Sequence, residues 1–242
     1  AYDRELFSGS ISGGGTLTSS FDLDKATPST DGINGRSRFA SLSHTQHFSP
    51  RASLRGSLDY SLDNTSRIDA GSATFDVTKR IEEVRAGLAP QFTLGEKTSL
   101  ALDGYYTRYY DQYLQDQRGS DANDRYEKTV DQLYAAGAQL NHQLGRHALS
   151  LGFEGQFESL VADRLSTRGE RDRQSVFLQD ELSLLNNNAL TLVPGVRYDR
   201  DSQFGSATSP KLALRYNFSP DFFVRAGAGQ GYRAPDFKQL LL

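Results

Sequence analysis

The stretch that decides the fold is ASLRGSLDYSL, residues 52–62. Its even-numbered residues are apolar or small, and the odd-numbered residues between them are polar or charged. Successive side chains of a β-strand point to opposite faces, so a strand separates these two sets, whereas a helix would mix them. The stretch therefore predicts a long strand with one apolar and one polar face.

The same alternation returns along the chain, from residue 149 to 158, 175 to 184, 190 to 199, 211 to 218 and 222 to 233. The connections between these segments alternate between short and long, which predicts an up-and-down meander of about eleven strands. The short turns are expected at Ser49-Pro50, Leu94 to Lys97, Leu144 to His147, Asn186 to Asn188 and Ser219 to Asp221. The long loops are expected at Asp24 to Gly35, Asp63 to Thr74, Gln115 to Asp124, Arg164 to Asp172 and Arg200 to Ser209.

Segment length favours a membrane barrel over a soluble sandwich. Strands of soluble proteins average about 5 to 6 residues, whereas strands that cross a bilayer need about 9 to 11, and several segments here exceed that. Aromatic residues of apolar-face parity fall near both ends, as in the two interfacial girdles of outer-membrane barrels, although aromatics also occupy strand ends of other sheets. They are Phe48, Phe92, Phe218 and Phe222 near the short turns, and Tyr60, Tyr106, Tyr126, Tyr198 and Tyr232 near the long loops.

Composition excludes several other classes of protein. No apolar run reaches the roughly 18 residues of a transmembrane helix, and the absence of cysteine excludes thiolate chemistry and disulfides. The net charge of −3 argues against nucleic-acid binding, which normally needs a basic excess. A mean hydropathy of −0.57 would give a poor soluble core. In a barrel the apolar residues are needed on the lipid-facing surface only, so this low hydropathy is compatible with the predicted fold.

Three motifs near the end of the chain carry a resemblance to a family. They are GVRYD at 195–199, SPKLALRY at 209–216 and GYRAPDF at 231–237, preceded by FLQDE at 177–181. In this order the chain resembles the barrel of TonB-dependent outer-membrane receptors. The resemblance implies an all-β fold: an antiparallel up-and-down transmembrane β-barrel segment of about eleven strands, part of a 22-stranded barrel.

The resemblance also implies a function. In this family a plug domain closes the barrel, and energy relayed through TonB drives import of a large nutrient chelate of the iron-siderophore, haem or cobalamin class. Residues 1–242 are expected to be a barrel portion without plug or TonB box, in the bacterial outer membrane and in contact with lipid and lipopolysaccharide. A passive pore or structural barrel is the main alternative, and a hydrolase at the barrel rim a weaker one.

Ligand-binding residues are expected on the polar face near the long loops, where they would line an extracellular vestibule. Basic groups suit the oxygens of an anionic chelate, and tyrosine adds stacking and a phenolic hydrogen bond. The alternative is that these side chains pair across the barrel wall or contact a plug. The candidates are Tyr109, Asp111, Tyr113, Glu158, Arg197, Asp199, Lys211 and Arg233.

No catalytic residues, no resident cofactor and no metal site are expected. Glu154 and Glu158 share one face, but positions i and i+4 of a strand lie about 13 Å apart, too far for a paired carboxylate site. His44 and His47 fall on opposite faces. The cluster Asp121, Asn123 and Asp124 could bind structural Ca²⁺ but lacks the spacing of a dedicated loop. The run from Arg168 to Arg173 suggests a solvated loop that could meet lipopolysaccharide phosphates.

Overall fold

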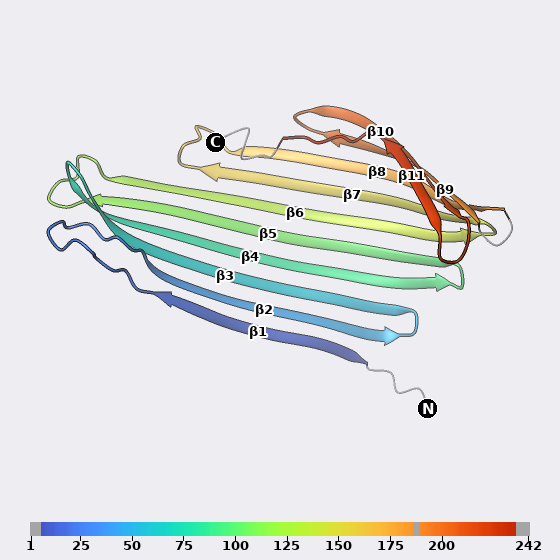
Figure 1. Cartoon of the computed structure of the whole chain (residues 1–242), viewed down its shortest axis with the longest axis horizontal. Helices are drawn as coiled ribbons and strands as arrows, with labels where there is room; N and C mark the ends of the chain where they lie inside the picture. The colour runs from blue at the N-terminus through green and yellow to red at the C-terminus, as the bar shows by residue number, and fades with distance from the viewer. Residues whose placement is uncertain (1–5, 186–188, 236–242) are drawn as a thin grey trace.

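The computed structural model describes residues 6–185 and 189–235 and shows one sheet of eleven strands (Figure 1). Each strand pairs antiparallel with its neighbours in sequence order, which confirms the predicted meander. No helix in this part of the chain is long and apolar enough to cross a membrane. The strands are β1 (Phe7–Thr18), β2 (Asn34–Ser49), β3 (Ala52–Ala70), β4 (Thr74–Gly95), β5 (Thr98–Gln117), β6 (Arg125–Leu144), β7 (His147–Ala162), β8 (Gly169–Leu184), β9 (Leu190–Asp201), β10 (Gly205–Asn217) and β11 (Phe223–Gly229).

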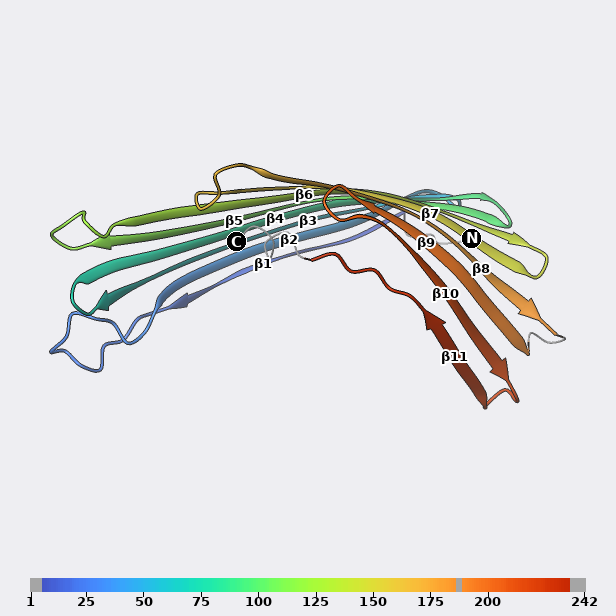
Figure 2. The ribbon, with the colours of Figure 1, turned by 90° about the horizontal axis from the view of Figure 1, so that it is seen from above.

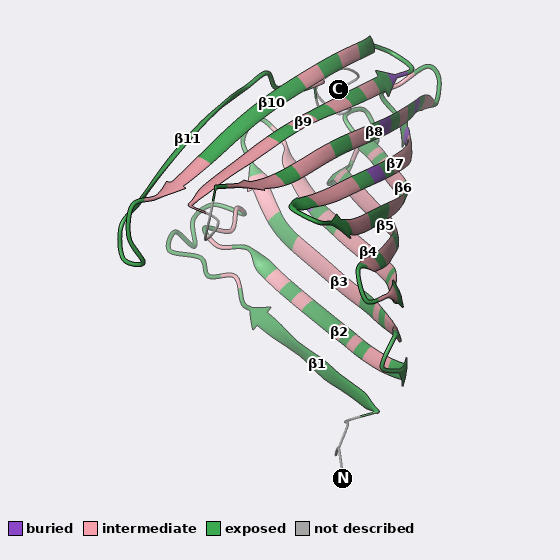
Figure 3. Cartoon of the chain, turned by 90° about the vertical axis from the view of Figure 1, so that its right-hand side faces the viewer, coloured by how far each residue is buried: buried purple, intermediate pink, exposed green. Residues whose placement is uncertain are grey.

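The sheet is open and strongly curved. Figures 2 and 3 show β1 to β7 as a broad wall from which β8 to β11 bend away, so that the sheet has a concave face. Among the described residues, β1 and β11 form the two edges and each has one strand neighbour. An arc of consecutive antiparallel strands is the geometry of part of a barrel wall.

The strand register keeps the apolar and polar sets on separate faces. Leu58 of β3 lies opposite Leu42 of β2 and Ala86 of β4, whereas Asp59 lies opposite Ser41 and Arg85. Among the described residues only three hydrophobic side chains are buried, and large ones such as Leu58 and Leu88 are 47% and 59% exposed. A sheet without a core must cover this surface with something other than its own chain, and in a barrel wall lipid does so.

The outward apolar run of β3 has the length of a bilayer core. From Leu54 to Leu62 it covers eight residue steps, about 26 Å at about 3.3 Å per residue, close to the roughly 25 Å apolar band of outer-membrane barrels. β4 has 22 residues and therefore continues well beyond that band.

Substitution of Leu58 by arginine tests this assignment of the faces. A cation at the middle of the lipid-facing band is expected to lower the free energy of unfolding by about 2–4 kcal/mol. Ser61→Arg is the matched control, because Ser61 lies on the polar face opposite Glu83, and it should change stability by less than 1 kcal/mol. Equal destabilisation of the two variants, measured by urea unfolding in lipid vesicles, would contradict the assignment.

Two of the predicted long loops are wrong. Where a loop was expected from Asp63 to Thr74, β3 and β4 continue and only residues 71–73 connect them. Residues 202–204 likewise suffice between β9 and β10. Beyond the apolar band both faces of a strand are polar, so the alternation that predicts strands disappears there. Cross-strand contacts such as the Arg118–Asp76 ion pair help to hold these extensions (Arg118 Nε and Nη2 each 2.8 Å from Asp76).

The last predicted strand is also shorter than expected. β11 ends at Gly229, and the final backbone contact to β10 is the amide of Gln230, which donates to the carbonyl of Pro210 (2.9 Å). Pro210 has no N–H to continue a ladder, and the glycines of this stretch add no side chains. Tyr232, predicted in the outer girdle, therefore follows β11 in a separate segment. The predicted turn at Asn186 to Asn188 and the end of the last motif lie outside the described residues.

Candidate functional site

The segment from Gln230 to Pro235 crosses the concave face and encloses a cavity against the sheet. Figure 2 shows this dark red segment running back from β11 inside the curve. The cavity has a volume of about 660 Å³, within the range of small-molecule sites. Its walls are inward residues of β7 to β10 together with the crossing segment; those that bear on its chemistry are Glu154, Arg173, Phe177, Arg197, Asp199, Asp201, Lys211, Tyr232 and Arg233.

The acidic groups of this cavity are already occupied by arginines. Arg197 Nη2 donates to Glu154 (2.6 Å) and its Nε donates to Asp199 (2.9 Å). Ser175 Oγ also donates to Glu154 (3.2 Å). Charge-assisted contacts of this kind fix the side chains that make them. Arg197, Glu154 and Asp199 therefore form a preorganised polar surface whose charges already compensate one another.

Lys211, Arg233 and Arg200 are the charged residues of the cavity that form no ion pair within the described chain. Arg200 lies opposite Gln174, on the other face of the sheet from Arg197 and Asp199, which leaves Lys211 and Arg233 as the cations of interest. The stem of Lys211 lies over Gly195 of β9, so close that a Cβ at Gly195 would lie 2.7 Å from Lys211 Cε. The glycine lets the lysine stem lie directly against the sheet. Arg233 approaches from the crossing segment. The acids are committed and these two cations are not, so the cavity favours an anion.

An aromatic ring covers the neighbouring part of the concave face. Phe177 of β8 pairs with Gly152 of β7, and a Cβ at Gly152 would lie 2.0 Å from its ring. Only glycine permits this close approach, which lays the ring flat along the sheet. Phe177 and Tyr232 therefore give the cavity aromatic surface beside its charged groups.

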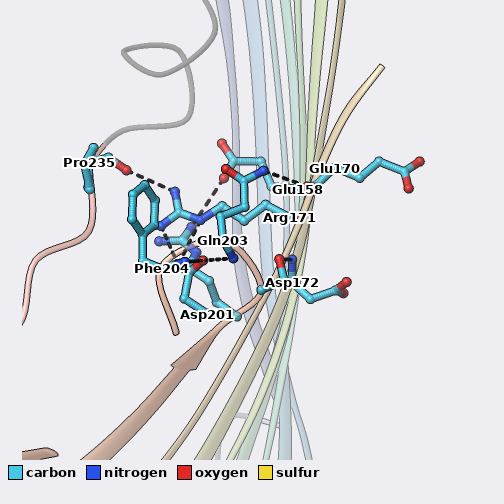
Figure 4. Close-up of polar contacts among 10 residues, drawn as sticks. Glu158, Glu170, Arg171, Asp172, Asp201, Gln203, Phe204 and Pro235 are labelled. Carbon is cyan, nitrogen blue, oxygen red and sulfur yellow. Dashed lines mark hydrogen bonds and ion pairs between the residues drawn. The ribbon is translucent and has the colours of Figure 1, made fainter. Parts of the chain in front are cut away.

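A buried ion pair anchors the crossing segment next to the cavity. Arg171 Nε and Nη2 donate to Asp201 (2.9 and 2.5 Å), and Arg171 Nη1 donates to the carbonyl of Pro235 (3.0 Å). The two side chains are 1% and 2% exposed. The other oxygen of Asp201 accepts the backbone N–H groups of Gln203 and Phe204 (2.9 and 3.3 Å). Figure 4 shows Arg171 on the side of Pro235, whereas Glu170 and Asp172 point away.

The structure brings together four of the residues expected from the sequence: Arg197, Asp199, Lys211 and Arg233 all line the cavity. Glu158 lies next to it, where its carboxylate meets Arg173 (3.6 Å). Arg233 takes its place from the crossing segment instead of from a strand, because β11 ends early.

Tyr109, Asp111 and Tyr113 form a separate group on the concave side of β5. Tyr109 Oη donates to Asp111 (3.3 Å), and Asp111 also meets Lys79 (3.5 Å). Tyr113 Oη donates to Gln115 (3.0 Å). One strand, β6, separates β5 from β7, the first strand of the cavity wall, which is about 10 Å at about 4.8 Å per strand spacing. These residues do not line the cavity.

The sequence interpretation of Arg168 to Arg173 as a solvated loop is wrong. β8 begins at Gly169, and Arg171 has the largest fully buried side chain in the described part of the chain. The sequence signal that could have placed Arg171 in a strand is its parity, because Arg171, Arg173 and Ser175 alternate along the polar face of β8. Its partner Asp201 is found only through the strand register, which places Arg173 opposite Asp201.

The cluster Asp121, Asn123 and Asp124 lies in the connection between β5 and β6, and two of its side chains form hydrogen bonds back to the end of β5. Asp124 accepts the N–H of Gln117 (2.7 Å), and the amide of Asn123 donates to the side chain of Gln117 (2.6 Å). In the same connection the contact with Asp76 raises the pKa of the Arg118 guanidinium. No group of three or more histidine and acidic side chains suited to a metal ion occurs among residues 6–185 and 189–235.

Together, the lipid-facing outer surface and the charged vestibule on the concave face define the wall of an outer-membrane receptor barrel. The family model of the TonB dependent receptor-like beta-barrel matches residues 7–242. The chain therefore belongs to the TonB-dependent receptor family, which confirms the resemblance seen in its last motifs. This is a family of receptors and transporters and not of enzymes, and its place is the bacterial outer membrane.

Among curated proteins, the chain is 28% identical over 210 residues to the iron-regulated outer membrane virulence protein of Vibrio cholerae, covering 78% of this chain and 31% of that protein. It is 30% identical over 115 residues to the ferric enterobactin receptor PirA of Pseudomonas aeruginosa, covering 45% and 15%. A solved structure of the ferric enterobactin receptor PfeA of the same organism superposes with a TM-score of 0.73 at 16% identity, over 98% of this chain and 41% of that one. The chain spans about a third or less of the length of these curated relatives.

Proposed function

We propose that this chain is the barrel portion of a receptor that imports an anionic metal chelate of the ferric siderophore class. The observation that carries the proposal is the cavity in which every lining acid is engaged, whereas Lys211 and Arg233 form no ion pair with residues 6–185 or 189–235. Arginine and lysine attract carboxylate or catecholate oxygens, and Phe177 and Tyr232 offer surface for flat ligand groups. The names of the relatives, which include ferric enterobactin receptors, support the same class.

In the proposed import, energy comes from TonB through a plug domain that residues 1–242 do not supply, and the barrel needs no resident cofactor of its own. Outer-membrane lipid and lipopolysaccharide are the proposed partners of the outer face. Tyr109, Asp111 and Tyr113 are proposed as a second contact zone on the same concave face, on β5, which β6 separates from the cavity wall.

Uptake of radioactive iron by cells that carry the full-length receptor tests this function. Ferric complexes with negatively charged catecholate ligands should accumulate in cells with TonB, and deletion of TonB should abolish their accumulation. Cobalamin and haem serve as competitors, and neither should reduce uptake at tenfold excess. Uptake that continues without TonB, or an ion-conducting pore in vesicles, would instead support the passive-pore alternative.

A further inference from the structure

The outward face of β2 to β6 becomes basic at the end of its apolar band, in the rows that contain Tyr60 and Leu62 and in the row beyond them. One continuous row runs across the five strands: Arg36 of β2 lies opposite Asn64, Asn64 opposite Arg80, Arg80 opposite Gln112 and Gln112 opposite Lys128. Arg38 lies in the row nearer the apolar band, and Arg108 in the row after that. All of these positions share the face of Leu58 and Leu88. We call this set the basic surface; it consists of Arg36, Arg38, Arg80, Arg108 and Lys128.

The spacing of the basic surface is regular. Arg36, Arg80 and Lys128 lie on alternate strands, hence about 10 Å apart, and successive rows are separated by about 7 Å along the strands. A patch of roughly 20 by 14 Å results, an area comparable to a lipid headgroup that bears several charges.

Few of these charges are compensated within the protein. Glu82 is the one acid in these three rows of β2 to β6, and it meets Arg80 (2.6 Å) and Arg108 (3.1 Å). Neither Arg36, Arg38 nor Lys128 forms an ion pair in the described chain. Five cations and one acid leave a net charge of +4. The next row, from Asn34 to Tyr126, is neutral; beyond it lie Asp116 and Asp76, the latter bound by Arg118.

The position of the basic surface indicates what it faces. Three tyrosines share this face: Tyr110 lies in the row of Arg38, Tyr60 in the row of Arg108, and Tyr106 one row nearer the middle of the apolar band. The Arg108 guanidinium lies over the Tyr110 ring (5.4 Å). Aromatic side chains at this height mark the boundary between hydrocarbon and headgroups. Arg36, Arg80 and Lys128, one row beyond Leu62, therefore lie in the headgroup layer, and the long side chains of Arg38 and Arg108 can extend to it from the rows of Leu62 and Tyr60. All five lie on the opposite side of the sheet from the cavity and cannot serve a ligand bound there.

We propose that the basic surface binds the phosphorylated headgroup of an outer-leaflet lipid. Arginine pairs with phosphate oxygens through two parallel hydrogen bonds, and cations close to an anionic leaflet are attracted to it. The inference refines the proposed lipid partner and does not depend on the proposed chelate. Loss of lipid binding with intact chelate binding, or the reverse, separates the two.

The triple variant Arg36→Gln, Arg80→Gln, Lys128→Gln tests the proposal in the full-length receptor in detergent. The probe is lipid A with both phosphates, titrated by native mass spectrometry. Each cation near an anionic surface contributes roughly fivefold to binding, so the triple variant should bind at least tenfold more weakly. Added salt should weaken binding of the unaltered receptor as well, because it screens exposed charges. If the triple variant does not fold, Lys128→Gln alone should show a loss of about fivefold.

The matched control carries Arg55→Gln, Arg67→Gln and Arg85→Gln, which remove the same charge from the polar face of β3 and β4. This control should bind lipid A as the unaltered receptor does. Lipid A treated with phosphatase should bind both proteins weakly, and inorganic phosphate should not compete at equal concentration. Equal affinity of the triple variant and the control for lipid A would overturn the proposal, as would full competition by inorganic phosphate.

Discussion

Replacing Asp201 with alanine is expected to lower the free energy of unfolding by about 3–5 kcal/mol, the usual cost of removing one partner of a buried ion pair. The substitution leaves the guanidinium of Arg171 uncompensated at a position that is 1% exposed. It also removes the acceptor for two backbone N–H groups of the connection between β9 and β10. Urea unfolding of the full-length receptor in detergent, followed by circular dichroism, measures the loss.

The same variant should release the crossing segment. Arg171 holds that segment through its hydrogen bond to the carbonyl of Pro235. Without Asp201 the guanidinium loses the ion pair that fixes its position and keeps only the weaker contact with the Phe204 ring (5.2 Å). Trypsin should then cleave after Arg233 at least tenfold faster than in the unaltered protein. Unchanged cleavage would show that other contacts hold the segment.

A double variant, Arg171→Met with Asp201→Leu, distinguishes the cost of an unpaired charge from the value of the pair. Buried ion pairs replaced by apolar residues of similar volume are often close to neutral. The double variant should therefore recover most of the stability that Asp201→Ala loses. Recovery of less than about 1 kcal/mol would contradict this explanation and assign the effect to the backbone contacts of Asp201.

The second large effect is expected on ligand binding. Lys211→Gln with Arg233→Gln removes the two uncommitted cations of the cavity while keeping side chains of similar size. A hydrogen bond to a charged group contributes about 1.5–3 kcal/mol, so an anionic ferric chelate should bind about 100-fold more weakly or worse. Equilibrium binding to the detergent-purified receptor gives the affinity directly.

Arg55→Gln with Arg67→Gln is the control for this experiment, since it removes two charges from the concave face outside the cavity. It should change the affinity for the chelate less than threefold, because exposed charges at that distance are screened. An equal loss in both variants would indicate a general attraction of the lumen for anions. That result would contradict the assignment of the cavity as the specific binding site for the chelate.

The strands were predictable where one face contacts lipid and the other contacts water, because the side chains then alternate between apolar and polar. From Ala52 to Leu62 the alternation alone fixes which side chains face outward, and β3 follows it. The same reasoning failed from Asp63 to Thr74, where water surrounds both faces and hydropathy carries no period. There the strands are held by backbone pairing and by ion pairs, and neither is visible in a single sequence.

The site was predictable as a face but not as a cavity. Parity identified Arg197, Asp199 and Lys211 as inward residues, and all three line the cavity. It could not show that Tyr109 and Asp111, on β5, lie outside the cavity that β7 to β10 form, because distance across a sheet depends on strand order and curvature. Arg171 was missed because a run of mixed charges resembles a loop, and only its register with Asp201 shows why a charge is tolerated there.

The three-residue connections at 71–73 and 202–204 determine which surface this rim of the sheet offers to an antibody. The exposed rim at these places is hydrogen-bonded ribbon, whereas residues 19–33 form a longer loop. Antibodies against these ribbons should recognise a folded epitope made of two strands, and synthetic peptides of either strand should make poor immunogens. An inserted tag should be displayed without damage within 19–33, whereas at 71–73 it would separate two strands that the rim needs joined.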